Sequence, residues 1–209
     1  MAQGHFKHAE ELESRRGEGA DDDDPSYAPP ADFNPSMRLS QSGETNNLIG
    51  RTQGMTLAST STAFTRIGAR AARSSTDAAM GSRAADYAAG MQPAPVVIQE
   101  GYEWCHRIAA CLGGPTDRAN LFCGGFHANT HMLALEQKLT GKTHLEVQVE
   151  VRCRQGTVMA EEIVYRVRKP GGSKVYEDSI DSQSTGFSAD DYKRVRDALG
   201  KWLRVYGRG

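Results

Sequence analysis

The sequence predicts an α+β fold for the second half of the chain, and two patterns support this prediction. The first is strict alternation of apolar and polar residues from 143 to 153, which is typical of a half-buried strand. Its apolar face would hold Leu145, Val147, Val149, Val151 and Cys153. The second is a C-terminal helix, because Ser188 followed by Asp191 makes a capping-type start. Its apolar residues recur at helical spacing: Tyr192, Val195, Leu199, Trp202 and Val205.

Further strands are expected on either side of the alternating segment. The stretch "PAPVVIQEGYEW" from residue 93 has a short β-branched run that suits a strand. "EEIVYRVRK" repeats the alternation through Ile163, Tyr165 and Val167, and "PGG" at 170–172 is typical of a turn into "SKVYEDSI". A small antiparallel sheet is therefore predicted.

The first ninety residues have a composition that forms a core poorly. Only 38% of the 209 residues are hydrophobic and 22 are glycine, so a tail beside one ordinary domain is expected. Residues 1–55 contain "DDDD" followed by four prolines, which predicts a largely disordered acidic tail. Residues 56–90 are rich in Ala and Ser and predict a linker or a marginal helix, with turns around Phe64, Ile67 and Ala71. The globular domain would span residues 91–209.

Charge, hydropathy and cysteine content bear on three questions: nucleic-acid binding, membrane insertion or secretion, and disulfide formation. The net charge of −1 combines −6 over residues 1–32, +3 over 33–90 and +2 over 91–209, so charge alone does not indicate nucleic-acid binding. No apolar run is long enough for a membrane span or a secretory signal. We expect synthesis in the cytoplasm, with any export depending on a dedicated secretion system. Four cysteines without a Cys-x-x-Cys pair favour free thiols.

Histidine, cysteine and asparagine gather between residues 104 and 136. After "GGPTDRANLF" the chain would enter a helix near Ala128 and leave it near Leu139, with Gly141 as the cap. Asn129 and Glu136 are seven residues apart and would share one helix face. The neighbouring stripe is predicted to face the core: Ala128, Met132, Leu135 and Leu139. His127 and His131 would point to roughly the opposite side from Asn129.

Two kinds of metal site are compatible with these residues. In the first, a zinc ion is held by the soft ligands Cys105, Cys111, Cys123, His127 and His131. His-x-x-x-His on a helix is a known zinc spacing, but the cysteine spacings match no tight knuckle. In the second, His106 faces a magnesium ion held by Asn129 and Glu136, which offer the oxygen ligands that magnesium prefers.

"HRIAACLGGPTDRANLF" followed by "NTHMLALE" resembles the DNA/RNA non-specific endonucleases of the ββα-metal class, especially the toxin branch of polymorphic bacterial toxins. The resemblance covers residues 96 to about 168. It implies a ββα-metal nuclease-like core, with His106 as the general base and Asn129 as a magnesium ligand. It further implies Glu136 as a metal ligand or catalytic water-orienting carboxylate, and Asn120 as a loop-shaping residue.

The sequence departs from the family in one place. Known members precede the histidine with Asp-Arg-Gly, whereas Glu103, Trp104 and Cys105 precede His106 here. Basic residues close to the motif could meet substrate phosphates, foremost Arg107 and Arg118. The chemistry agrees with the residue types, because imidazole can accept a proton from water near pH 7 while magnesium offsets phosphate charge.

The sequence thus predicts a magnesium-dependent, sequence-tolerant nuclease that cuts DNA, RNA or both and serves as a bacterial toxin or injected effector. An immunity protein would be its partner, and the N-terminal segment would contact a delivery apparatus. Two alternatives stay open. One is a zinc-stabilised, non-enzymatic binding module, and the other is a structural protein of a phage or secretion system, suggested by the long polar N-terminus.

Overall fold

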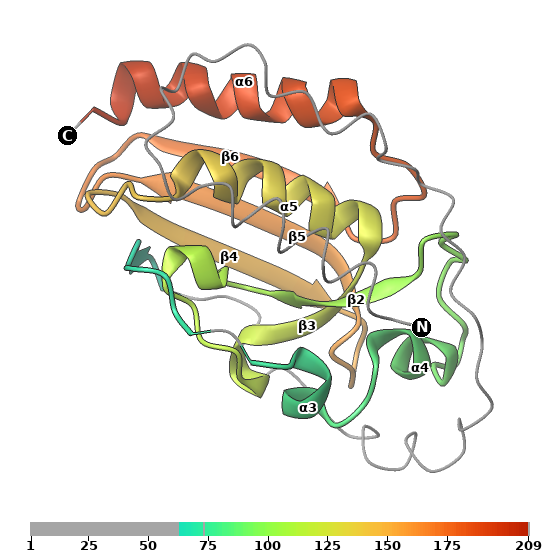
Figure 1. The fold of residues 1–209 in the computed structure, drawn as a ribbon. Helices are drawn as coiled ribbons and strands as arrows, with labels where there is room; N and C mark the ends of the chain where they lie inside the picture. Colours follow the sequence, from blue (N-terminus) through green and yellow to red (C-terminus); the bar gives the residue numbers. More distant parts are fainter. Residues whose placement is uncertain (1–62, 73, 209) are drawn as a thin grey trace. The chain divides into compact units, whose positions relative to one another are not determined.

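The computed structural model describes residues 63–72 and 74–208. Four antiparallel strands form its larger sheet in the order β1-β4-β5-β6 (Figure 1). They span Thr65–Arg66 in β1, Glu146–Cys153 in β4, Ala160–Arg168 in β5 and Val175–Asp181 in β6. The mixed α+β class and the antiparallel sheet predicted from the sequence are confirmed. The tail expected at residues 1–55 lies outside the described residues.

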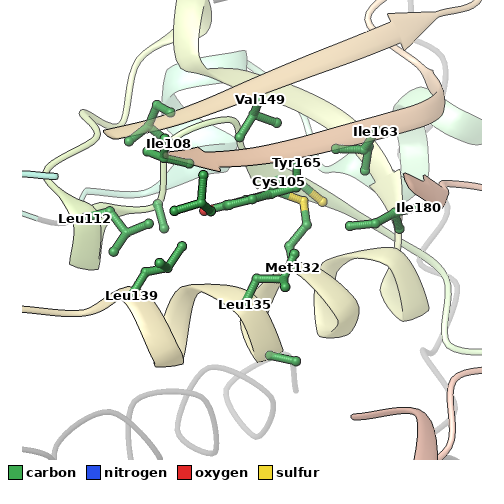
Figure 2. Packing of buried hydrophobic residues seen from close by; sticks show 14 of the residues in the cluster. Cys105, Ile108, Leu112, Met132, Leu135, Leu139, Val149, Ile163, Tyr165 and Ile180 are labelled. Carbon is green, nitrogen blue, oxygen red and sulfur yellow. The ribbon is translucent and has the colours of Figure 1, made fainter. Parts of the chain in front are cut away.

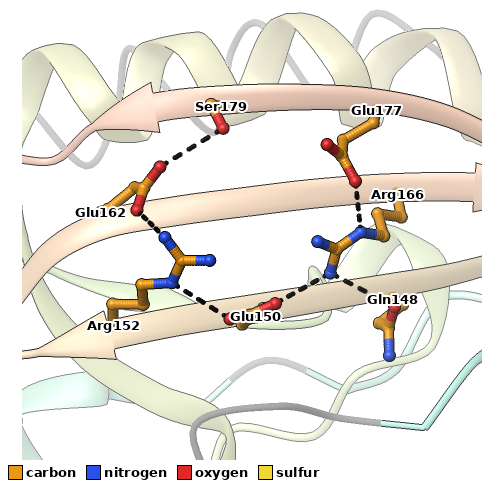
Figure 3. Close-up of polar contacts among 7 residues, drawn as sticks. All are labelled: Gln148, Glu150, Arg152, Glu162, Arg166, Glu177 and Ser179. Carbon is orange, nitrogen blue, oxygen red and sulfur yellow. Dashed lines mark hydrogen bonds and ion pairs between the residues drawn. The ribbon is translucent and has the colours of Figure 1, made fainter.

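One face of this sheet forms the core, as the alternation predicted. Leu145, Val147, Val149 and Val151 are fully buried, and Ile163, Tyr165 and Val167 are buried beside them. The opposite face carries charged residues that alternate with the buried ones. There Glu150 pairs with Arg152 and Arg166, while Arg166 also contacts Glu177 of β6 (Figure 3). The two faces therefore follow from the period of two along each strand.

Helices α5 (Phe126–Leu139) and α6 (Ala189–Tyr206) cover the apolar face (Figure 1). Met132, Leu135 and Leu139 of α5 are buried against the sheet, as Figure 2 shows. The predicted start of α6 is confirmed, because the side chains and backbone of Ser188 and Asp191 form a reciprocal capping box. Val195 and Leu199 are buried as predicted, but Val205 is 67% exposed and that part of the prediction is wrong.

Strands β2 (Tyr102–His106) and β3 (Leu121–Gly125) pair antiparallel in a separate two-stranded sheet. Strand β3 leads directly into α5, since Gly125 is the residue before its first turn. The helix begins at Phe126, two residues before the predicted start. Its C-cap is Thr140, and the expected Gly141 follows with a φ of 79°. The chain order is thus strand, strand, helix across the stretch that holds the histidines.

A second buried cluster lies on the other side of this hairpin. Helices α3 (Thr76–Met80) and α4 (Ala84–Ala89) supply Met80 and Tyr87, which pack with Trp104 of β2. The Tyr87 and Trp104 ring centroids are 5.2 Å apart, and the Trp104 indole donates a 2.7 Å hydrogen bond to the Ser82 carbonyl. Residues before position 91 therefore belong to the compact unit, and the boundary expected at 91 falls within it.

Two other local predictions are wrong. The turns expected around Phe64, Ile67 and Ala71 do not form a helix, because Thr65–Arg66 instead pairs with β4 as strand β1. The β-branched run Val96–Ile98 is not part of a strand, and the strand begins at Tyr102. Ile98 is buried there while Val97 is 88% exposed, and no strand of the described residues pairs with this run. Across residues 63–72 and 74–208, no helix is long and apolar enough to span a membrane.

Candidate functional site

The two faces of β2 look toward different parts of the molecule. Cys105 lies in the cluster beneath α5, where Figure 2 shows it close to Met132, whereas Trp104 lies in the cluster beside α4. Because side chains alternate along a strand, Glu103 shares the α5 side with Cys105. The strand therefore places a carboxylate at the surface of helix α5.

Asn129 of α5 meets this carboxylate. Its side-chain Nδ2 donates a hydrogen bond of 2.6 Å to Oε2 of Glu103, and both residues are partly buried. The bond joins the strand that ends in His106 to the helix that carries Asn129 and Glu136. Because Nδ2 donates this bond, the other end of the Asn129 amide, the acceptor oxygen Oδ1, does not face the Glu103 carboxylate.

Glu136 lies two helical turns beyond Asn129 and is partly buried. The negative charge of Glu136 contributes to the raised pKa of two neighbouring groups, Cys105 and Tyr165. Burial raises the pKa of Cys105 well above its usual value, and the charges of Glu103 and Glu136 raise it further. Burial, with a contribution from Glu136, likewise raises the pKa of Tyr165. Glu103 and Glu136 therefore both lie close enough to Cys105 to interact with it electrostatically.

His106 is the last residue of β2 and is paired with Leu121 in the hairpin. Its Nε2 lies 3.0 Å from Oγ1 of Thr116, which belongs to the loop between the two strands. Asn129 forms its hydrogen bond with Glu103, and His106 forms its hydrogen bond with Thr116. These two hydrogen bonds do not link His106 to Asn129. The two contacts anchor the same strand to a helix on one hand and to a loop on the other.

The loop that holds Thr116 is closed by Asn120. The Asn120 Oδ1 accepts from the Ile108 amide at 3.0 Å, and its Nδ2 donates to the carbonyls of Ile108 and Pro115 at 2.8 Å each. Gly114 packs so tightly that a Cβ there would lie 1.7 Å from the Ile108 carbonyl oxygen. The Gly-Gly-Pro sequence and Asn120 thus fix the loop beside His106.

The two arginines expected to contact substrate occupy different environments. Arg107 is only 4% exposed, and burial lowers its pKa. Arg118 is exposed, and its Nε donates a 2.8 Å hydrogen bond to the Ala79 carbonyl at the end of α3. The Arg118 side chain is therefore accessible at the surface, whereas the Arg107 guanidinium is covered.

The helix histidines have separate carboxylate partners. His127 Nε2 lies 2.9 Å from Glu100, and both side chains are largely buried. His131 Nε2 lies 3.1 Å from Asp178 of β6, and its ring stacks on Phe187 with centroids 4.8 Å apart. These contacts tie α5 to the segment before β2 and to the larger sheet.

The four cysteines form no disulfide with one another, and three of them are buried. Burial raises the pKa of the Cys123 thiol strongly and that of Cys153 to about 11. Of the residues proposed as soft zinc ligands, His127 and His131 instead contact Glu100 and Asp178. Within the described residues, three or more His, Cys, Asp or Glu side chains nowhere gather as a metal-binding group.

The donor chemistry beside β2 fits magnesium better than zinc. Glu103 holds the Asn129 amide through its nitrogen, which leaves the amide oxygen of Asn129 and the carboxylate of Glu136 further along the same helix as candidate oxygen ligands. Magnesium keeps several waters and needs only one or two protein ligands. The oxygen set therefore suits a hard, largely hydrated cation.

Comparison of the chain with protein-family models, with curated proteins and with solved structures finds no match.

Two residues of this site were not predicted from the sequence. Glu103 stands three positions before His106, where the sequence shows it only as a departure from the family motif. Its alternation with Cys105 could have suggested that it faces the helix. Thr116 carries no sequence signal, because its contact with His106 depends on how the loop folds back.

Proposed function

We propose that this protein is a magnesium-dependent nuclease that hydrolyses phosphodiester bonds of DNA, RNA or both with little sequence preference. The hydrogen bond between Glu103 and Asn129 is the observation that supports it most. It joins the strand ending in His106 to the helix bearing Asn129 and Glu136. Alternation along β2 puts His106 on the Trp104 side of the strand, so the proton acceptor and the oxygen ligands come from adjoining elements but from opposite faces of β2. The order of β2, β3 and α5 fits a ββα-metal core.

In this proposal His106 is the general base. Its imidazole takes a proton from water, the water oxygen bonds to phosphorus, and the bond between phosphorus and the leaving sugar oxygen breaks. Thr116 orients the ring through Nε2, and Asn120 keeps the loop in place. The leaving oxygen then takes up a proton from solvent.

Asn129 and Glu136 would hold magnesium, with Glu103 orienting the Asn129 amide. A bound magnesium ion would supply positive charge for the phosphate oxygens. Arg118, which is exposed beside the loop, would contact substrate phosphate. Arg107 would need to leave its buried position to do the same.

The biological role that fits best is that of a bacterial toxin or injected effector. An immunity protein would protect the producing cell, and the N-terminal segment would serve delivery by a secretion system. Residues 1–62 lie outside the described residues, so this part of the proposal depends on the sequence alone.

The deciding experiment is incubation of the full-length protein with plasmid DNA and with structured RNA, in magnesium and in EDTA. Cleavage that requires magnesium supports the proposal, and the preferred substrate identifies the nucleic acid. Metal analysis of the same preparation should find no tightly held zinc. One bound zinc per chain without magnesium-dependent cleavage would instead favour the zinc-stabilised binding module.

A further inference from the structure

One end of the compact unit combines exposed cations with aromatic side chains. The turn between β5 and β6 and the last turns of α6 meet there (Figure 1). The Tyr176 and Trp202 ring centroids are 6.3 Å apart, and those of Trp202 and Tyr206 are 6.0 Å apart. His144 of the loop before β4 bonds the Gly207 carbonyl at 2.7 Å, which brings a third segment to the same place.

The two segments that meet at this end carry only positive charges, and the nearest acidic residues along the chain are Glu177 and Asp197 at their borders. Residues 169–176 and 198–208 contain no Asp or Glu. They contribute five exposed cations, which we call the basic end: Lys169, Lys174, Lys201, Arg204 and Arg208. Within the described residues none of the five takes part in an ion pair, in contrast to the arginines of the outer sheet face. Their charges are therefore available to an anionic partner.

Apolar exposure coincides with this charge. Tyr206 is 44% exposed, and Val205, its neighbour in α6, is 67% exposed. Trp202 and Tyr176 are only partly covered. Ring faces interleaved with Lys and Arg are the arrangement by which proteins hold unpaired nucleotides, since bases stack on the rings while phosphates contact the cations.

We propose that the basic end binds a strand of DNA or RNA whose bases are accessible, with Tyr206 as the stacking residue. The inference rests on the proposed nuclease function, because it takes nucleic acid as the substrate, and it gives that substrate a contact surface separate from His106 and Asn129. Overall charge conceals this surface, because the acidic residues lie elsewhere in the chain.

Binding should be measured on the full-length protein in EDTA, which prevents magnesium-dependent cleavage, with a fluorescent single-stranded oligonucleotide and its duplex. Lys201→Gln, Arg204→Gln and Arg208→Gln together should remove up to three phosphate contacts. For single strands each contact adds about 0.7 to the slope of log affinity against log salt. The slope should fall by about 2, and affinity at 0.1 M salt by about a hundredfold.

A matched control removes three cations elsewhere, through Arg83→Gln, Lys193→Gln and Arg194→Gln. Because Arg83 and Arg194 are engaged with Asp86 and Asp191, this variant should keep most of the affinity. Tyr206→Ala should weaken single-strand binding about fivefold to a hundredfold, with little effect on the duplex, whereas Tyr206→Phe should retain binding. Circular dichroism and thermal unfolding establish that each variant is folded.

Equal losses in the two triple variants would overturn the inference, since they would show a general effect of charge. An unchanged affinity in Tyr206→Ala, with polyglutamate displacing the oligonucleotide, would overturn it as well and assign this end to an acidic protein. Cleavage is scored separately on plasmid and RNA. If the wild-type protein does not cleave either substrate, the nuclease function is refuted. If the basic-end variant then still loses binding relative to that wild-type protein, the basic end remains a nucleic-acid binding surface.

Discussion

Glu103 on β2 accepts a hydrogen bond of 2.6 Å from Asn129 on α5, and this contact joins the two elements that carry the candidate catalytic and metal-binding residues. A carboxylate acceptor makes such a bond stronger than one between neutral groups. The pair is therefore expected to act both in stability and in the placement of the Asn129 amide.

A double-mutant cycle with Glu103→Gln and Asn129→Ala tests this pair. Each single change should lower the free energy of unfolding by about 1 to 3 kcal/mol, and the double variant should lose less than the sum. In cleavage assays both should raise the magnesium concentration needed for half-maximal rate. Additive losses, with an unchanged magnesium dependence, would show that the contact has no such role.

His106→Ala should reduce cleavage by about a hundredfold to ten-thousandfold, because a general base contributes that much to the rate. Loss of the Thr116 hydrogen bond should lower the free energy of unfolding by only about 0.5 to 1.5 kcal/mol and leave the protein folded. His131→Ala is the control, because His131 is also a partly buried histidine but contacts Asp178 of β6, away from the loop of His106. It should leave the cleavage rate nearly unchanged. Imidazole added to His106→Ala can restore part of the rate. A folded His106→Ala protein with full activity would refute the mechanism.

Gly114→Ala should be strongly destabilising. Its Cβ would lie 1.7 Å from the Ile108 carbonyl oxygen and 2.9 Å from Asn120 Nδ2, so the loop beside His106 would have to move. We expect a loss of about 3 kcal/mol in urea unfolding, together with reduced activity. Gly186→Ala is the control, because nothing lies within 4 Å of a Cβ there. Similar stability of the two variants would contradict the tight packing.

The start of α6 should confer acid-sensitive stability. Hydrogen bonds from Arg194 and Ser188 lower the pKa of Asp191 well below its ordinary value. A lowered pKa in the folded state means that the contribution is fully present above about pH 4, and it is lost as pH falls through the folded pKa.

Asp191→Asn should therefore weaken the folded protein at pH 7 and flatten the decline in stability between roughly pH 4 and pH 2. Asp190→Asn removes the same charge in the same turn but lies outside this hydrogen-bond set. Urea unfolding at several pH values compares the two. Identical acid profiles would show that the cap does not titrate as described.

Tyr87 should be essential to the compact unit even though it precedes the boundary expected at residue 91. Tyr87→Ala would empty space beside Trp104 and should cost about 3 to 5 kcal/mol. Tyr87→Phe removes only the hydroxyl that accepts from the Val158 amide at 3.0 Å, and should cost about 1 to 3 kcal/mol. Tryptophan fluorescence and urea unfolding measure both, with exposed Tyr206→Ala as the stability control. An unaffected Tyr87→Ala protein would support independent folding from residue 91.

The sequence by itself determined the elements whose signals are local. Alternation identified β4 and β5, because a strand with one buried face must place apolar residues at every second position. Helical spacing identified the buried stripe of α5, and the Ser188–Asp191 pair marked the start of α6 through bonds within one turn. The candidate residues His106, Asn129 and Glu136 were identified by order and spacing.

Only the tertiary structure decided which groups meet. Glu103 bonds Asn129 across 26 positions, and Trp104 packs on Tyr87 of a helix that the composition made look marginal. Long-range packing also buries Arg107 and brings together the three chain segments that form the basic end. Local propensity fixes the period of an element, but which face meets which neighbour depends on surfaces brought together from distant parts of the chain.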